Sequence, residues 1–262
     1  MTGAKIMTEG HYSGHHFKSE MKAEYKSTVS LGISYLGLSL SASLNPAKMM
    51  GKYHDYELNF KYYGKRFGFD LSYQESKNFT GWKEMDDEGR VDLPADMLSV
   101  KMLNINAYYC FNSRKFSYPS AFSPNYIQRR SAGSFLLSLS GQGQRGTVYD
   151  EVPMKFKMTN IGVGGGYGYN YVPRKGWLFH ISALPTLIVF SKTSLTISET
   201  EVPLHYYFPE VIITGRGAIV KQAGRMFFGI SGVYNFCNIG NKERLAVDNI
   251  KWNARAYVGI RL

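Results

Sequence analysis

Apolar residues recur at every second position in many short segments of this chain, and this pattern constrains the fold more than any other feature. The clearest segment closes the sequence. Its polar and charged residues alternate with Ile250, Trp252, Ala254, Ala256, Val258, Ile260 and Leu262. Neighbouring side chains of a β-strand point to opposite faces, so a period of two gives a strand one apolar and one polar face. The sequence therefore predicts an all-β fold.

Repeats of this alternation predict about 12 strands, an even number as expected for a single-chain bacterial outer-membrane barrel. The segments are 17–25, 29–35, 38–44, 56–62, 67–73, 103–111, 135–139, 161–171, 177–189, 211–220, 226–236 and 250–262. Short connections alternate with longer polar ones, as periplasmic turns alternate with external loops in such barrels. We therefore predict one closed antiparallel transmembrane β-barrel over residues 17–262, with both termini in the periplasm.

The N-terminal residues 1–16 are predicted to be disordered or derived from expression. Residues 1–10 lack the charged-then-apolar pattern of an export signal, although a protein of the outer membrane must be exported. We expect the chain to be a mature form, a truncation or an expression product.

Two other architectures were weighed against the barrel. The most apolar run, 183–190, is interrupted by Pro185 and is far shorter than the roughly 18 residues of a membrane-spanning helix. A soluble β-sandwich also has alternating strands, so periodicity does not exclude it. Aromatic residues at strand ends favour the barrel, because interfacial girdles place them there. These residues are Tyr35, Tyr171, Trp177 and Trp252.

Three segments carry a family resemblance: STVSLGISYLGLSLSASL (27–44), RKFSYPSAF (114–122) and QRRSAGSFLL (128–137). They resemble an uncharacterised family of predicted outer-membrane β-barrel proteins from Bacteroides-type Gram-negative bacteria. The resemblance implies a barrel located in the outer membrane. It implies no catalytic residue, because none is assigned to that family.

Charged residues are predicted to line the interior of the barrel. They are Lys18, Glu20, Lys22, Glu24, Glu57, Lys61, Asp70, Arg216, Lys251, Arg255 and Arg261. If the first and last strands pair, then Lys251, Arg255 and Arg261 should approach Glu20 and Glu24. The set is interpreted either as a salt-bridge network that fills the interior or as a selectivity lining for a small polar or anionic solute.

One connection on the short-turn side is unusually long, running from Asn112 to Ala132. Long structured loops are more often functional than ordinary linkers, so a partner-binding or plugging role competes with that of a solvated loop. The residues predicted to act there are Arg114, Lys115, Tyr118, Arg129 and Arg130.

The search for other chemistry is largely negative. His180 and Ser182 share a predicted inner face and suggest an outer-membrane lipid hydrolase, but no GxSxG motif accompanies them. The net charge of +11 does not indicate nucleic-acid binding, because the aromatic residues and the cations fall on opposite strand faces. No metal site, cofactor or catalytic residue is predicted.

The function predicted from the sequence is therefore non-enzymatic. We expect an outer-membrane barrel that passes a small polar or anionic solute or serves as a scaffold for an envelope protein complex. Its expected partners are outer-membrane lipid and lipopolysaccharide, and possible protein partners are other envelope proteins. A lipid-acting hydrolase and a soluble β-sandwich binding module remain the alternatives.

Overall fold

The protein folds into one continuous antiparallel β-sheet, seen here in a computed structural model. The residues described are 2–12, 15–23, 29–35, 38–44, 56–77, 79–86, 89–94, 97–122, 126–149, 154–197, 200–204, 206, 208–241 and 245–260. Within these ranges no helix is both long and apolar enough to span a membrane.

Sixteen strands and one 3₁₀ helix make up the described part of the chain. They are β1 (Thr2–Tyr12), β2 (His15–Ala23), β3 (Val29–Tyr35), β4 (Leu38–Leu44), β5 (Tyr56–Tyr63), β6 (Phe67–Ser76), β7 (Phe79–Met85), β8 (Gly89–Leu93), β9 (Leu98–Cys110), η2 (Tyr118–Ala121), β10 (Ala132–Val148), β11 (Met154–Tyr171), β12 (Trp177–Ile197), β13 (Thr200–Leu204), β14 (Glu210–Ala223), β15 (Met226–Asn241) and β16 (Leu245–Ile260).

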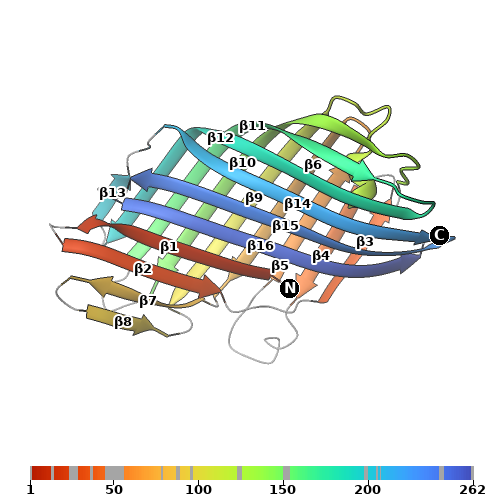
Figure 1. Cartoon of the computed structure of the whole chain (residues 1–262). Helices are drawn as coiled ribbons and strands as arrows, with labels where there is room; N and C mark the ends of the chain where they lie inside the picture. The colour runs from red at the N-terminus through yellow and green to blue at the C-terminus, as the bar shows by residue number, and fades with distance from the viewer. Residues whose placement is uncertain are drawn as a thin grey trace.

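Fifteen of the strands lie in the order β3-β4-β5-β6-β9-β10-β11-β12-β14-β15-β16-β1-β2-β7-β8, and β13 pairs with β12. The sheet curls, so that β14, β15 and β16 pass in front of β4, β5 and β6 (Figure 1). The short connections, such as 64–66 and 224–225, lie at one end of the strands, which we call the turn end. The β7–β8 hairpin and β13 lie at the opposite end, the loop end (Figure 1).

Contacts between strands that are far apart in the sheet identify its inner face. Asp70 of β6 meets Arg216 of β14, and Lys251 of β16 donates a hydrogen bond to Gln74 of β6. The side chains that alternate with these inner residues form the outer face. Many of them are large, apolar and exposed, including Ile181 at 69% and Phe135 at 68%.

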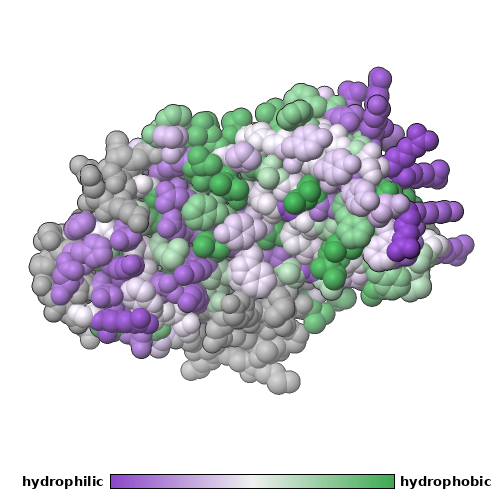
Figure 2. All heavy atoms as spheres, in the orientation of Figure 1, coloured by the Kyte–Doolittle hydropathy of each residue, from purple (hydrophilic) through white to green (hydrophobic). Residues whose placement is uncertain are grey.

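The exposed apolar residues form a band that we call the apolar belt. On β9 the belt runs from Leu103 to Phe111, a span that matches the 9 to 11 or so residues of a transmembrane strand. Hydrophobic residues gather in the middle of the molecule, and hydrophilic ones gather at both ends (Figure 2).

At the loop end, beyond the belt, the inner face is apolar and the outer face is charged. Lys18, Glu20 and Lys22 of β2 alternate with Met21 and Ala23, which pack with a buried apolar cluster. The buried members of this cluster are Phe79, Leu98 and Val100. We call this part of the sheet the loop-end region. Its apolar side chains point inward and its charged side chains point outward.

The structure differs from the sequence predictions in three respects. The described residues include more strands than the predicted 12, because β1, β7, β8 and β13 had no counterpart in the alternation pattern. Residues 2–12, predicted to be disordered, form β1 and pair with both β16 and β2. The third difference concerns the alternative of a soluble β-sandwich. A β-sandwich buries its apolar faces between two sheets, whereas here one sheet leaves many of its apolar side chains exposed.

Candidate functional site

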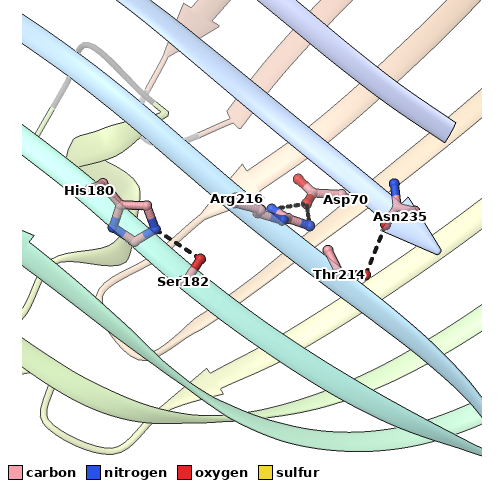
Figure 3. A network of polar contacts seen from close by, with 6 residues as sticks. All are labelled: Asp70, His180, Ser182, Thr214, Arg216 and Asn235. Atoms are coloured by element: carbon pink, nitrogen blue, oxygen red, sulfur yellow. Dashed lines mark hydrogen bonds and ion pairs between the residues drawn. The ribbon is translucent and has the colours of Figure 1, made fainter. Parts of the chain in front are cut away.

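A buried ion pair lies at the centre of the interior. The Arg216 Nη1 and Nη2 atoms each lie 3.2 Å from Asp70 Oδ2, and both side chains are almost fully buried. Figure 3 shows this pair beside a second polar contact, in which the Thr214 hydroxyl donates to Asn235 Oδ1 at 2.8 Å. Three strands of the sheet, β6, β14 and β15, therefore meet here through polar side chains.

The segment from Phe116 to Phe122 folds into the interior at the turn end, and we call it the plug. It contains η2, and its residues Phe116, Tyr118 and Ala121 are at most 1% exposed. The helix η2 contacts β11, β12 and β14. The long connection between β9 and β10 therefore closes the turn end of the interior instead of extending away from it.

Asn170 of β11 fastens the plug through hydrogen bonds. Its Nδ2 donates to the Ser117 carbonyl at 2.9 Å and to Gln128 Oε1 at 2.6 Å. Gln128 Oε1 also accepts from the Ser117 backbone N–H at 2.7 Å, and Gln128 Nε2 donates to the Arg130 carbonyl at 2.8 Å. These bonds satisfy polar groups that would otherwise be buried at a cost.

Aromatic contacts also hold the plug in the interior. The ring of Tyr118 lies 4.7 Å from that of Tyr108 and 5.4 Å from that of His180, measured between centroids. The Arg216 guanidinium carbon lies 5.9 Å from the ring centroids of both Tyr118 and Phe122. Arg216 thus interacts with the sheet through Asp70 and with the plug through these rings.

Small residues on the inner face of β11 make room for the plug. A Cβ added at Gly168 would come within 3.0 Å of the Phe116 ring, and one at Gly164 within 2.4 Å of Thr186 Oγ1. Gly162 and Gly166 are similarly crowded by β12. Gly168 therefore makes room for the plug itself, and the other three glycines make room for the close approach of the neighbouring strands.

His180 and Ser182 have the geometry of a base and a nucleophile. The His180 Nε2 atom lies 3.0 Å from Ser182 Oγ, and its Nδ1 atom lies 2.6 Å from Asn170 Oδ1. Figure 3 shows the first of these contacts. A hydroxyl, an imidazole and an orienting acceptor in this order resemble the arrangement of a hydrolase triad. Here all three are buried, and Phe116, Tyr118 and Phe122 pack around His180.

The predicted interior charges divide into three groups. Six lie on the inner face: Glu57, Lys61, Asp70, Arg216, Lys251 and Arg255. Lys18, Glu20 and Lys22 lie instead on the outer face, opposite the cluster around Phe79. This part of β2 is in the loop-end region, where the apolar side chains point inward. Glu24 and Arg261 lie outside the described residues.

The predicted contact between Glu20 and the cations of the last strand is not what the structure shows. The strand β1 lies between β16 and β2, and Glu20 pairs with Lys5 at 3.0 Å and Lys22 at 2.6 Å. Lys251 reaches across the interior to Gln74 Oε1 at 2.6 Å. The error arose because the sequence pattern did not reveal β1.

The five residues predicted to act in the long connection fall into a buried and an exposed group. Tyr118 is buried in the plug, whereas four cations are exposed at the turn end. These cations are Arg114, Lys115, Arg129 and Arg130. Sequence reasoning missed Asn170 and Gln128, whose roles depend on pairing between distant segments.

Comparison with known proteins adds a family and little else. No curated protein matches the chain. One solved structure with some likeness is OmpT (in-vitro folded), an outer membrane protein of Vibrio cholerae, which is 7% identical over 98% of this chain and 97% of that one. Its TM-score is 0.23, so this likeness carries no argument here. The family model described as "Domain of unknown function (DUF4421)" matches residues 1–261, and the chain belongs to that family.

Proposed function

We propose that the protein is an integral β-barrel of the bacterial outer membrane, closed internally by a plug, and that it serves as a non-enzymatic scaffold in the cell envelope. The observation that carries the membrane assignment is the apolar belt. Large apolar side chains are exposed on its outer face, while Asp70 and Asn170 are buried inside it and the side chain of Arg216 is only 12% exposed. A water-soluble domain buries these two kinds of residue the other way round. A transmembrane barrel has this arrangement.

The strand pairings support closure of the barrel. Only residues 77–78 separate β6 from β7 along the chain, and β7 pairs with β2 from Phe17↔Met85 to Ala23↔Phe79. Following the pairings from β6 through β9 to β16, β1 and β2 therefore leads back to β7. These pairings close the ring in the loop-end region. In the belt, β3 and the end of β16 have no partner among the described residues, and spanning a membrane with strands requires those edges to be paired as well.

The plug supports a scaffold in preference to an open pore. It fills the turn end of the interior and is held by Asn170, Gln128 and Arg216. The exposed cations of the same connection face away from the plug and offer a surface to an acidic envelope partner. In this proposal the barrel anchors and orients that surface at the periplasmic side of the membrane.

The first experiment tests the membrane assignment. Protein purified in detergent should migrate differently on an SDS gel before and after boiling, because a closed barrel resists SDS until it is heated. A monomer that stays soluble without detergent would refute the proposal. The scaffold role then predicts that a co-purifying partner is lost when the 112–132 connection is shortened.

Passage of a small anionic solute is the second candidate, and the charged interior favours it. Lys61, Arg216 and Arg255 lie close together and outnumber the neighbouring carboxylates of Asp70 and Glu57. Under this alternative the unmodified protein conducts in planar bilayers and Arg255→Glu changes its ion preference. Under the scaffold proposal the unmodified protein does not conduct ions in planar bilayers. The double substitution Asn170→Ala and Gln128→Ala should then open the pore, whereas Arg129→Ala, on the exposed part of the connection, should not.

The non-enzymatic part of the proposal concerns His180 and Ser182. We assign their hydrogen bonds to a structural role in holding the plug, because the rings of Tyr118 and Phe122 pack against His180. We expect no phospholipid turnover by folded protein in mixed micelles. Turnover that disappears in Ser182→Ala, while the heat-dependent gel shift is retained, would make the protein a hydrolase.

A further inference from the structure

Two strand edges in the apolar belt have no partner among the described residues. The first is β3, which pairs with β4 on one side and ends the sheet on the other. The second is the part of β16 from Arg255 to Ile260, which pairs only with β15. The pairing of β1 with β16 stops at Thr2↔Asn253, just before this part begins.

Both edges lie where the outer face is apolar. Leu31 and Ile33 of β3 are 80% and 74% exposed, and Val258 and Ile260 of β16 are 65% and 64% exposed. In the hydrocarbon region no water is present to satisfy an unpaired backbone N–H or carbonyl group. If the proposed membrane location holds, these two edges therefore require a partner.

The neighbouring pairings define how wide the opening is. A single strand, β1, separates β16 from β2 in the loop-end region. Along the chain β3 follows β2, while β16 continues past Asn253 toward the turn end. If β3 continues the line of β2, the opening between β3 and the end of β16 corresponds to one strand.

The direction of the missing strand also follows. Both β16 and β2 run antiparallel to β1, so they run parallel to each other. Ten antiparallel pairings lead from β3 through β4 to β16, so β3 and β16 also run parallel to each other. Direct pairing of β3 with β16 would therefore create a parallel pair in a sheet whose described pairs are all antiparallel. A strand that lies between them and runs in the direction of β1 avoids this.

We propose that β3 and residues 255–260 of β16 form a slot for one extended segment, which is joined to β1 and continues it toward the turn end. The proposal rests on the membrane barrel proposed above. Eleven strands from β3 to β16 surround the turn end, so this segment would make the number even, as in single-chain bacterial barrels. Residues opposite Ala256, Val258 and Ile260 should be apolar, and those opposite Arg255 and Tyr257 should be polar or acidic.

The test adds six alternating valine and threonine residues ahead of Met1, in a background where Cys110 and Cys237 are replaced by serine. Continuing the register of Thr2↔Asn253 places the fourth residue before Met1 opposite Val258. Cysteines at that added position and at Val258 should form a disulfide in folded protein. A cysteine at Ile219, which also lies on the outer face but on β14, should not form one with the added cysteine.

Four further outcomes decide between the proposals. A proline- and glycine-rich extension of equal length should give no disulfide, because proline lacks the N–H that a strand must donate. Absence of the Val258 disulfide in a heat-modifiable barrel would overturn the slot and leave the membrane assignment intact. A disulfide between Leu31→Cys and Val258→Cys without any extension would show that the edges pair directly, which also overturns the slot. A soluble protein would refute the membrane assignment itself.

Discussion

The apolar belt and the loop-end region are parts of the same sheet, yet they bury opposite kinds of side chain. Within the belt the outer face is apolar, and the interior holds Asp70 and Arg216. In the loop-end region the outer face carries Glu20 and its lysine partners, and the interior holds Phe79 and its apolar neighbours. The alternation along the strands is the same in both regions. In the proposed membrane location, lipid surrounds the belt and water surrounds the loop-end region, and this difference accounts for the exchange of faces.

The position of the boundary can be followed along single strands. On β6 the outer residues are apolar up to Tyr73, and the next outer residue is Glu75, which pairs with Lys101 of β9 at 3.3 Å. On β11 the outer face changes from Ile161 to Thr159 and then to Lys157. Charged residues thus begin at a similar level on neighbouring strands, as expected at the edge of a membrane.

The largest expected effect compares two ion pairs on either side of this boundary. Arg216→Ala leaves the Asp70 carboxylate buried without its partner, which should lower the free energy of unfolding by about 3–5 kcal/mol. Lys101→Ala removes the half-exposed partner of Glu75 and should cost about 1 kcal/mol or less. Urea unfolding in lipid vesicles, followed by tryptophan fluorescence, measures both. Equal losses would mean that the interior of the belt is as hydrated as its outer edge.

A companion variant separates charge from packing. Replacing the pair together, with Asp70→Leu and Arg216→Met, removes the unpaired charge and should recover most of the stability lost in Arg216→Ala. If the double variant is no more stable than Arg216→Ala, then the contacts of Arg216 with the rings of Tyr118 and Phe122 make the larger contribution.

The second prediction places the same cation on the outer face of each region. Ile181→Arg puts a charge near the middle of the belt and should destabilise the barrel by about 2–4 kcal/mol. Thr159→Arg puts it beside Lys157, beyond the apolar residues, and should change stability by less than about 0.5 kcal/mol. Unfolding midpoints in vesicles give the comparison. If Ile181→Arg is tolerated as well as Thr159→Arg, the belt does not contact hydrocarbon.

The same comparison explains what the sequence could and could not predict. The strands of the belt alternate between apolar outer and polar inner residues, so they were recognisable from the sequence. The segment with Phe17, Met21 and Ala23 alternates in the same way, and nothing in the pattern states that its apolar face points inward. Its charged residues were therefore assigned to the wrong face.

The candidate site was predictable only in part, for a similar reason. The length of the 112–132 connection suggested a partner-binding or plugging role as an alternative to a solvated loop, and His180 and Ser182 are neighbours on one strand face. Asn170 joins them through the pairing Asn170↔His180 between β11 and β12. Register between strands is a property of the folded sheet, so the sequence alone did not identify that contact or the role of Gln128.

The smallest expected effect tests the outward position of Glu20 in the loop-end region. Its hydrogen bonds with Lys22 and Lys5 lower the pKa of the Glu20 carboxyl below its ordinary value. A lowered pKa means that the stabilisation is present above the ordinary pKa and is lost as the pH falls through the lowered one. Glu20→Gln should therefore cost about 1 kcal/mol or less at pH 7 and nothing in strong acid. High salt should shrink the loss at pH 7, because Lys22 and Lys5 are partly exposed to water. A loss that salt does not change would place Glu20 inside the barrel, where the sequence had predicted it.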